Sequence, residues 1–233
     1  MIRGFQKSSF VDFPGQPCSI IFFSNCNFRC GFCHNPELVT DDGSLPSFSS
    51  EDIIAELVSR KKFVCAACIS GGEPTLDPAM ITFVKQLKQE GFLVKLDTNA
   101  TNPEVIKKMI NAKLVDYFAV DIKGPKSDYN MIAGVKVDFD KLEQSLNLIA
   151  KSGVDYEFRT TVVPGIIKNL DKMAAWVNDI IGCKVKLWVL QEFENRKELL
   201  DPTLKETRPY PPKEMQELAD NISDYCEKVK IKA

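Results

Sequence analysis

Three cysteines stand close enough together to bind one metal centre. The segment SNCNFRCGFCHNP, residues 24–36, holds Cys26, Cys30 and Cys33 in the spacing C-x3-C-x2-C. An odd number does not suit a disulfide framework, and zinc or an iron–sulfur cluster bound only by cysteine normally takes four. A cubane cluster held by three cysteines leaves one iron with an open coordination site, and an open site on a metal is a site for chemistry.

The alternative is a structural zinc site completed by a second C-x2-C pair at Cys65 and Cys68. These two cysteines fall in a predicted strand, where positions three apart point to opposite faces, and the gap to the first pair is long. The pattern therefore favours a cluster over zinc. We expect the other five thiols to be reduced, buried packing residues: Cys18, Cys65, Cys68, Cys183 and Cys226.

The remaining composition excludes several classes of protein. His34 is the only histidine, so catalytic triads and histidine-rich zinc sites are ruled out. The net charge of −2 is spread along the chain and gives no sign of a nucleic-acid or lipid partner. The opening residues lack the apolar core of a signal peptide, and no apolar run reaches the length of a membrane span. We therefore expect a cytoplasmic protein, with no nucleic acid and no membrane among its partners.

Short apolar, β-rich runs alternate with amphipathic helical patterns about six times. This alternation predicts one parallel α/β domain over residues 1–233, with a core at about 16–192 and a C-terminal loop and helix at 193–233. The predicted strands are 18–23, 63–70, 92–98, 117–123, 156–163 and 185–191. The predicted helices are 49–62, 77–91, 102–113, 140–153, 169–182 and 211–229. A doubly wound sheet and an incomplete (β/α) barrel both fit this pattern.

Both architectures place their chemistry on the loops that leave the carboxyl ends of the strands. The unusual residues of this chain fall there. They are the cysteine triplet, the segment SGGEPT at 70–75, Asp97 to Asn99, Asp121 with Lys123, the segment VVPG at 162–165, and Gln191 with Glu192. Six such strand ends on one rim predict the mouth of an active site.

The cysteine triplet after the first strand, with the aromatic Phe32 just before its last cysteine, resembles the radical S-adenosylmethionine (SAM) superfamily. The resemblance implies a [4Fe–4S] cluster on Cys26, Cys30 and Cys33, with SAM chelated to the open iron and cleaved to a 5′-deoxyadenosyl radical. The segment SGGEP is similar to the family's GGE motif, which implies that Gly71, Gly72 and Glu73 lie against the SAM amino group. Ammonium needs acceptors, and glycine lets backbone carbonyls approach closely.

Further segments resemble the branch that activates glycyl radical enzymes. These are VDFPG, CHNP, LDTNA, VDIK and VVPG, and the likeness extends to about residue 192. The opening most resembles activating proteins of anaerobic ribonucleoside-triphosphate reductase, with the activating enzymes of pyruvate formate-lyase as close relatives. The resemblance implies an incomplete (β/α)6 TIM-like barrel, whose gap could admit a peptide loop. It implies an anaerobic ribonucleotide reductase as partner and reduced flavodoxin or ferredoxin as electron donor.

The same resemblance assigns further site residues. Asp97, Thr98 and Asp121, with the Ala119 carbonyl, fall where the formate-lyase activase binds a monovalent cation beside SAM, and hard oxygen ligands suit such an ion. Arg159 falls where a strand arginine helps to bind SAM, and Lys123 is expected either there or in an ion pair with an aspartate. His34 is expected to shape the cluster loop.

One departure weakens the case for formate-lyase as partner. The segment VLQEFEN lacks the histidine that the formate-lyase activase carries at the end of the sixth predicted strand. The rival hypotheses are therefore activation of formate-lyase or another glycyl radical enzyme, a small-molecule radical SAM reaction, and a non-catalytic zinc-binding module.

Overall fold

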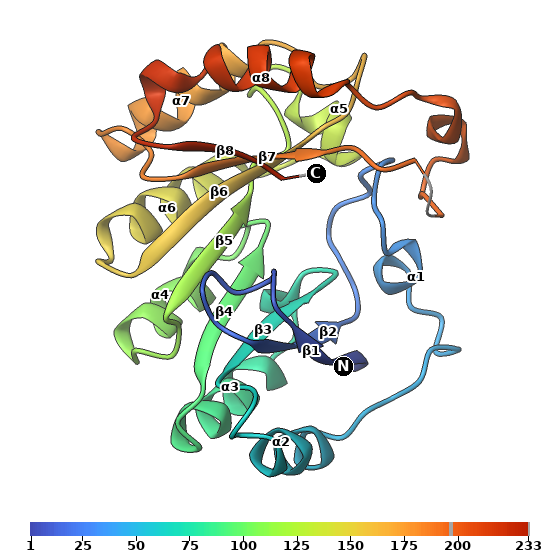
Figure 1. Cartoon of the computed structure of the whole chain (residues 1–233), viewed down its shortest axis with the longest axis vertical. Helices are drawn as coiled ribbons and strands as arrows, with labels where there is room; N and C mark the ends of the chain where they lie inside the picture. Colours follow the sequence, from blue (N-terminus) through green and yellow to red (C-terminus); the bar gives the residue numbers. More distant parts are fainter. Residues whose placement is uncertain (196–197, 233) are drawn as a thin grey trace.

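The computed structural model describes residues 1–195 and 198–232 and contains one mixed sheet of eight strands in the order β1 to β8. The six strands that the alternating pattern predicts are parallel and consecutive, and the sheet curls into an incomplete barrel (Figure 1). These six strands are β2 (Cys18–Phe23), β3 (Ala66–Gly71), β4 (Leu93–Thr98), β5 (Tyr117–Asp121), β6 (Asp155–Val162) and β7 (Trp188–Glu192).

Helices follow the strands, and most of them lie on the convex outer face of the sheet (Figure 1). They are α1 (Pro36–Val39), α2 (Ser50–Ser59), α3 (Ala79–Gln89), α4 (Pro103–Asn111), α5 (Tyr129–Ala133), α6 (Phe139–Lys151), α7 (Leu170–Ile181) and α8 (Pro212–Asp220). Their ends follow local signals, because Ser49 accepts the Asp52 N–H to cap α2 and Gly182 ends α7 with a left-handed backbone. Short 3-10 turns lie at η1 (Pro74–Leu76), η2 (Pro202–Glu206) and η3 (Ser223–Tyr225).

Both edge strands were absent from the prediction. Strand β1 (Ile2–Ser9) pairs antiparallel with β2, and β8 (Val229–Lys232) pairs parallel with β7. The final helix expected at 211–229 instead ends at Asp220, and the chain then forms η3 and β8. The prediction of only a loop and helix at 193–233 is therefore wrong. Both strands are rich in polar residues, and they form because a neighbouring strand offers a free ladder of hydrogen bonds.

The two faces of the sheet differ in character. Along β4, Val94 and Leu96 are fully buried in the large core under the helices, whereas Leu93 packs in a second, smaller cluster on the concave face. Alternation then turns Lys95 and Asp97 toward the same concave interior. Apolar side chains close the bottom of this interior: Phe13, Cys18, Ile20, Ala66 and Cys68. Charged side chains lie above them.

The five cysteines outside the triplet have different environments. Cys18, Cys68 and Cys226 are buried, as expected. Cys65 is only half-buried; it precedes β3 rather than lying in it, and its thiol donates to Gln16 Oε1 at 3.0 Å. Cys183 is exposed, so the prediction of a packing role is wrong for this residue. It follows the Gly182 cap of α7, where the chain turns at the surface.

The sheet stays open between its edges, since β1 and β8 do not pair with each other in the described residues. An ion pair links the chain at the two ends of the sheet, because Lys232 Nζ lies 3.9 Å from Asp12 Oδ1. Among residues 1–195 and 198–232, no helix is long and apolar enough to cross a lipid bilayer.

Candidate active site

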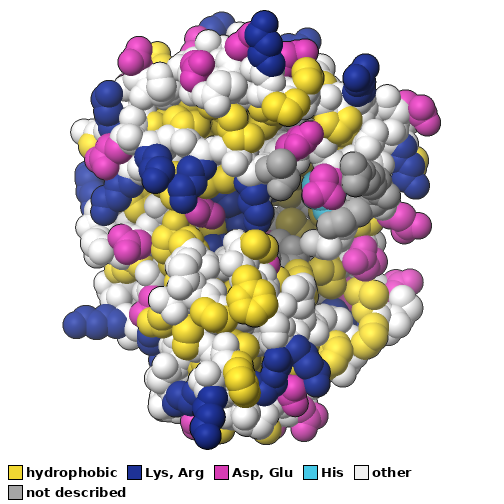
Figure 2. Space-filling model, viewed as in Figure 1, with side chains coloured by type: hydrophobic (Ala, Val, Ile, Leu, Met, Phe, Trp, Pro, Cys, Tyr) yellow, Lys and Arg dark blue, Asp and Glu magenta, His cyan; other side chains and the backbone are white. Residues whose placement is uncertain are grey.

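A pocket opens at the carboxyl ends of the parallel strands, and the molecular surface is hollowed near the middle of this face (Figure 2). The cavity has a volume of about 190 Å³. Residues from the loop after β2 and from the ends of β3 to β7 line it: Cys26, Phe28, Cys30, Phe32, Cys33, His34, Asn35, Val39, Ser70, Gly71, Gly72, Asp97, Thr98, Asn99, Asp121, Lys123, Arg159, Thr161 and Gln191. Most of the expected strand ends therefore meet at one cavity, but residues 162–165 and Glu192 are not among the residues that line it.

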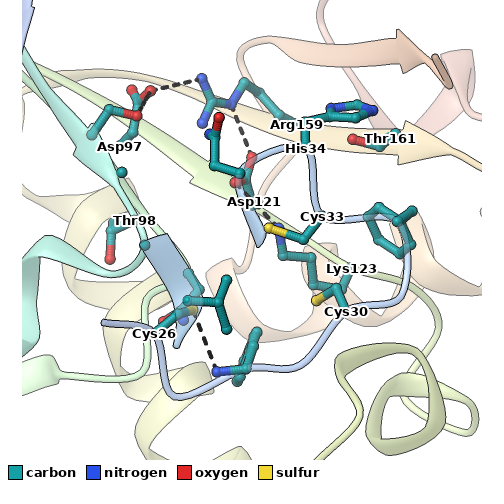
Figure 3. A pocket seen from close by; sticks show the side chains of 18 of the residues that line it. Cys26, Cys30, Cys33, His34, Asp97, Thr98, Asp121, Lys123, Arg159 and Thr161 are labelled. Atoms are coloured by element: carbon teal, nitrogen blue, oxygen red, sulfur yellow. Dashed lines mark hydrogen bonds and ion pairs between the residues drawn. The ribbon is translucent and has the colours of Figure 1, made fainter. Parts of the chain in front are cut away.

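The three cysteines of the triplet lie on one wall of this pocket (Figure 3). Cys30 is buried, while Cys26 and Cys33 are half-buried. Phe28 and Phe32 lie between these cysteines in the sequence. Their aromatic rings are buried and anchor the loop to the core. Three soft thiols on a short loop, with the loop fixed by its aromatic side chains, fit a polynuclear iron–sulfur centre.

Backbone hydrogen bonds hold the cluster loop from several directions. The Arg29 N–H donates to Ala133 O at the end of α5 at 2.7 Å, and the Asn25 N–H donates to Leu38 O, also at 2.7 Å. The Asp201 N–H donates to Gly31 O at 2.8 Å, so the segment beside η2 packs over the loop. Arg196 and Lys197, in the same C-terminal stretch, lie outside the described residues.

His34 joins the cluster loop to the chain that follows β7. Its Nε2 lies 3.2 Å from Glu194 O, and its ring stacks on Phe193 with centroids 6.4 Å apart. A carbonyl accepts, so this contact assigns the proton to Nε2. The geometry is that of a residue that shapes the loop.

Burial keeps the cysteine thiols protonated in the absence of a metal. It raises the pKa of Cys26 to about 11, and it also raises the pKa values of Cys30 and Cys33 above the ordinary thiol range. The nearby Lys123 ammonium opposes this shift at all three thiols. A metal that takes these ligands must therefore displace protons, with help from the positive charge of Lys123.

The two glycines of the GGE segment lie directly against the end of β2. A Cβ on Gly71, whose φ is +121°, would lie 2.2 Å from Phe23 O, and one on Gly72 would lie 2.2 Å from Asn25 O. The Gly72 N–H donates to Phe23 O at 2.8 Å. The glycines are thus required by the contact between two backbones, and this contact sets the floor of the pocket beside Cys26.

Glu73 is not among the residues that line the pocket, although the resemblance places it against the SAM amino group. It is fully buried, and its Oε1 accepts from the Thr75 N–H at 3.1 Å, the Thr75 hydroxyl at 2.5 Å and the Thr98 hydroxyl at 2.8 Å. Its Oε2 accepts from the Asn99 N–H at 2.6 Å. Burial raises the pKa of Glu73, while these donors favour its charged form. Glu73 therefore joins the ends of β3 and β4.

Charged side chains from three strands form a chain of ion pairs along the pocket (Figure 3). The Arg159 guanidinium bridges two carboxylates, with Nη1 3.3 Å from Asp97 Oδ2 and Nε 2.9 Å from Asp121 Oδ1. Lys123 Nζ donates to Asp121 Oδ2 at 3.3 Å. Lys95 contacts Asp97 Oδ1 from within the barrel. The expected ion pair of Lys123 with an aspartate is thus present.

The network shifts the pKa values of its members in opposite directions. Burial alone would raise the pKa values of Asp97 and Asp121, but the Arg159 guanidinium and a lysine beside each hold both below the ordinary range. Burial alone would lower the pKa values of Lys95 and Lys123, but the facing carboxylates raise both. All five groups are therefore charged at neutral pH.

Sequence reasoning did not name two residues of this site. Thr161 lines the pocket and Lys95 lies beneath it, whereas Ser70 and Asn99, which also line the pocket, belong to the predicted strand ends. Alternation along β4 could have placed Lys95 on the face of Asp97, because the two positions are two residues apart. The signal was a charged residue within an otherwise apolar strand.

The sequence of this chain also matches the model of a known protein family, and the geometry of the pocket agrees with that match. Residues 20–177 match the model of the Radical SAM superfamily, a span that includes all three cysteines and every charged residue of the site. The chain belongs to the radical SAM superfamily. Membership implies a [4Fe–4S] cluster and SAM as cofactors, and the thiol triplet and charged pocket are chemically suited to both.

Relatives narrow the position within the radical SAM superfamily. A Methanocaldococcus jannaschii protein named as a glycyl-radical enzyme activating enzyme is 31% identical over 239 residues, covering 100% of this chain and 95% of the relative. The pyruvate formate-lyase-activating enzyme of Clostridium pasteurianum is 29% identical over 191 residues, covering 77% of this chain and 76% of that enzyme. This radical SAM chain is therefore in the glycyl-radical-enzyme activating branch. The likeness to ribonucleotide reductase activators in particular has no support from these relatives.

Solved structures agree on the fold of this radical SAM protein. SuiB of Streptococcus suis, in a crystal structure with its precursor peptide SuiA, superposes with a TM-score of 0.71 at 15% identity. The alignment covers 92% of this chain and 48% of SuiB, so the chain spans about half the length of that protein. At this identity the likeness shows the shared partial barrel alone.

Proposed function

We propose that this protein generates a glycyl radical on a partner enzyme, using a [4Fe–4S] cluster and SAM in the pocket described above. The observation that carries the proposal is the meeting of three cysteine thiols with Lys123, Arg159 and the backbone at Gly71 in one cavity. When bound, the cluster and SAM supply a reductively formed radical that removes a hydrogen atom from a glycine α-carbon.

The residues of this chain have distinct parts in the proposal. Cys26, Cys30 and Cys33 would hold three irons and leave the fourth for SAM. Lys123 and Arg159 carry N–H donors suited to the SAM carboxylate, and the backbone at Gly71 and Gly72 offers acceptors close to the cysteine loop. The Phe32 ring, buried in the pocket wall, excludes water from the cysteines. Glu73 has an indirect part, because it positions the backbone at the ends of β3 and β4.

The first candidate partner is a pyruvate formate-lyase or a similar glycyl radical enzyme. Activating enzymes of formate-lyase are among the relatives, with similarity over three quarters of this chain. The open edge between β1 and β8 supports a polypeptide substrate, since a gap in the barrel wall can admit a loop. Anaerobic ribonucleotide reductase is the second candidate, favoured by one residue: Gln191 lines the pocket at the end of β7, where the formate-lyase activase is expected to have histidine.

An anaerobic activation assay tests this function. Protein reconstituted with iron and sulfide is reduced, mixed with SAM and each candidate partner, and examined by electron paramagnetic resonance. We expect a glycyl radical doublet with one partner, and reduced flavodoxin or ferredoxin should replace the chemical reductant. Cys30→Ala should abolish the signal, whereas Cys65→Ala, outside the pocket, should retain it. A colourless protein that binds one zinc ion would contradict the proposal.

A further inference from the structure

The family resemblance places a monovalent cation between Asp97, Thr98 and Asp121, but the side chains at this position already satisfy one another. Each of the four carboxylate oxygens accepts from a protein donor. Asp97 Oδ1 accepts from Lys95, and its Oδ2 accepts from Arg159 at 3.3 Å and from Ser70 Oγ at 3.1 Å. Asp121 accepts from Arg159 at 2.9 Å and from Lys123 at 3.3 Å.

Thr98, the third expected ligand, faces away from the two aspartates. Alternation along β4 turns its side chain to the face opposite that of Asp97. Its hydroxyl donates to Glu73 Oε1 at 2.8 Å and accepts from the Ala100 N–H at 3.0 Å. Both the direction and the hydrogen bonds of this hydroxyl therefore separate it from the carboxylates.

Lys95 is the residue that makes this site unusual. Its side chain is only 2% exposed, and it reaches up the concave face of β4 to the Asp97 carboxylate. Its ammonium also lies 3.8 Å from Cys68 Sγ. A buried lysine with a single carboxylate partner is a permanent positive charge placed against that carboxylate.

The balance of charge leaves no need for another cation. Three cationic side chains, Lys95, Arg159 and Lys123, face two carboxylates along this network. An alkali ion bound between Asp97 and Asp121 would have to displace or lie against the Arg159 guanidinium. Like charges at such short range repel strongly where water is largely excluded.

We propose that Lys95 and Arg159 supply internally the positive charge that an alkali cation would bring to Asp97 and Asp121, so that SAM binds without a monovalent cation. The inference rests on the proposed use of SAM at this site. It assigns Lys95 as a positioning residue that acts through Asp97 and Arg159.

The first test uses the wild-type, cluster-loaded protein without any partner. SAM affinity and the rate of 5′-deoxyadenosine formation are measured in potassium, in sodium, and in tetramethylammonium at equal ionic strength, which keeps screening constant. We expect values within about threefold of one another in the three salts. A larger loss in tetramethylammonium, restored by potassium or sodium, would overturn the proposal.

The second test removes the internal charge. Lys95→Met keeps the length of the side chain but leaves Asp97 with Arg159 and Ser70 alone, so this variant should bind SAM at least about tenfold more tightly in potassium or sodium than in tetramethylammonium. Lys88→Met is the matched control, because Lys88 pairs with Asp116 at 2.6 Å outside the pocket. The control should stay insensitive to the cation. A folded Lys95→Met variant with equal affinity in all salts would contradict the proposal.

A third measurement separates this inference from the proposed function. Thermal unfolding of the wild-type apoprotein needs neither cluster nor SAM, and its midpoint should be equal in potassium and tetramethylammonium. Specific stabilisation by potassium or sodium would show an alkali ion at the aspartates and overturn the inference, even if the activase assay succeeds. If the loaded protein bound no SAM, the proposed function would fail, while the apoprotein midpoint would still decide whether an ion is needed.

Discussion

The Glu73 carboxylate accepts a hydrogen bond from the Thr98 hydroxyl at 2.8 Å, although 25 residues separate them in the chain. The same carboxylate accepts the Asn99 N–H at 2.6 Å. These bonds tie the GGE segment after β3 to the end of β4, and they hold Gly71 and Gly72 against the cluster loop. Glu73 thus links two strand ends while its side chain stays outside the pocket.

Glu73→Gln should therefore lower stability as well as SAM affinity. Glutamine keeps the shape of the side chain but replaces one carboxylate oxygen with an NH₂ group. One of the groups that now donates to this carboxylate would then face another donor and lose its hydrogen bond, which costs about 1–3 kcal/mol for a buried group. Urea unfolding of the apoprotein measures this loss. Glu143→Gln, at a partly exposed ion pair with Lys126, is the control and should cost less than about 1 kcal/mol. Unchanged stability with lost SAM binding would show instead that Glu73 meets SAM directly.

Gly72→Ala should lower stability and iron retention more than the addition of a single methyl group usually does. The added methyl group would lie 2.2 Å from Asn25 O, so the cluster loop must move, at a cost of about 1–3 kcal/mol and with poorer retention of iron. Gly165→Ala is a useful comparison, because nothing lies within 4 Å of its Cβ and only its φ of +79° opposes alanine. Iron content after reconstitution should fall for Gly72→Ala alone. Equal iron loss in both variants would refute this explanation.

Acid should weaken the charged network. The pKa values of Asp97 and Asp121 are lower in the folded chain than the value of about 3.9 for unfolded aspartate. The unfolded chain then binds more protons at low pH, so their contribution is complete above about pH 5 and declines as the pH falls below about 4 toward the folded values.

The variant Asp97→Asn tests the direction of this pH dependence of stability. The substitution leaves Lys95 buried without its carboxylate, so the variant should be about 3–5 kcal/mol less stable at pH 7. The deficit should shrink as the pH is lowered toward 3, because Asp97 becomes protonated in the unfolded wild-type chain while it stays charged in the folded one, which lowers the stability of the wild-type protein. Asp140→Asn, at an exposed position of α6, should change stability by no more than about 0.5 kcal/mol. Urea unfolding over a series of pH values measures both variants, and a deficit that stays constant with pH would contradict the assignment.

The cysteine thiols should become reactive only at high pH in the apoprotein. Burial raises the pKa of Cys26 to about 11, and the thiolate is the nucleophile, so alkylation of this residue should still be rising with pH at about pH 10. Lys123→Met removes a charge that favours the thiolate and should slow the reaction further, whereas Lys126→Met should not. Mass spectrometry measures the modification, with the exposed Cys183 as internal reference. A rate that levels off near pH 8 would contradict this prediction.

Local patterns in the sequence were sufficient for most of the fold. Apolar runs separated by amphipathic segments predicted β2 to β7 and the longer helices α2, α3, α4, α6 and α7, because alternation and helical period depend on neighbouring residues. The short helices α1 and α5 were not predicted. The edge strands β1 and β8 were not predicted, because each is short or polar. Each is stabilised by pairing with a neighbouring strand, and the local pattern does not give the position of that strand. The last helix was predicted too long for the same reason.

For the site as well, some features could be predicted from the sequence and others depend on the tertiary structure. The spacing of Cys26, Cys30 and Cys33 on one loop, and the polar residues at the carboxyl ends of parallel strands, were sufficient to predict where the pocket lies. Only the folded chain decided that Glu73 bonds to Thr98 and that Arg159 bridges Asp97 and Asp121, because these contacts join different strands. The burial of Lys95 against Asp97 likewise depends on how the sheet curls, since curvature determines which side chains the interior shields from water.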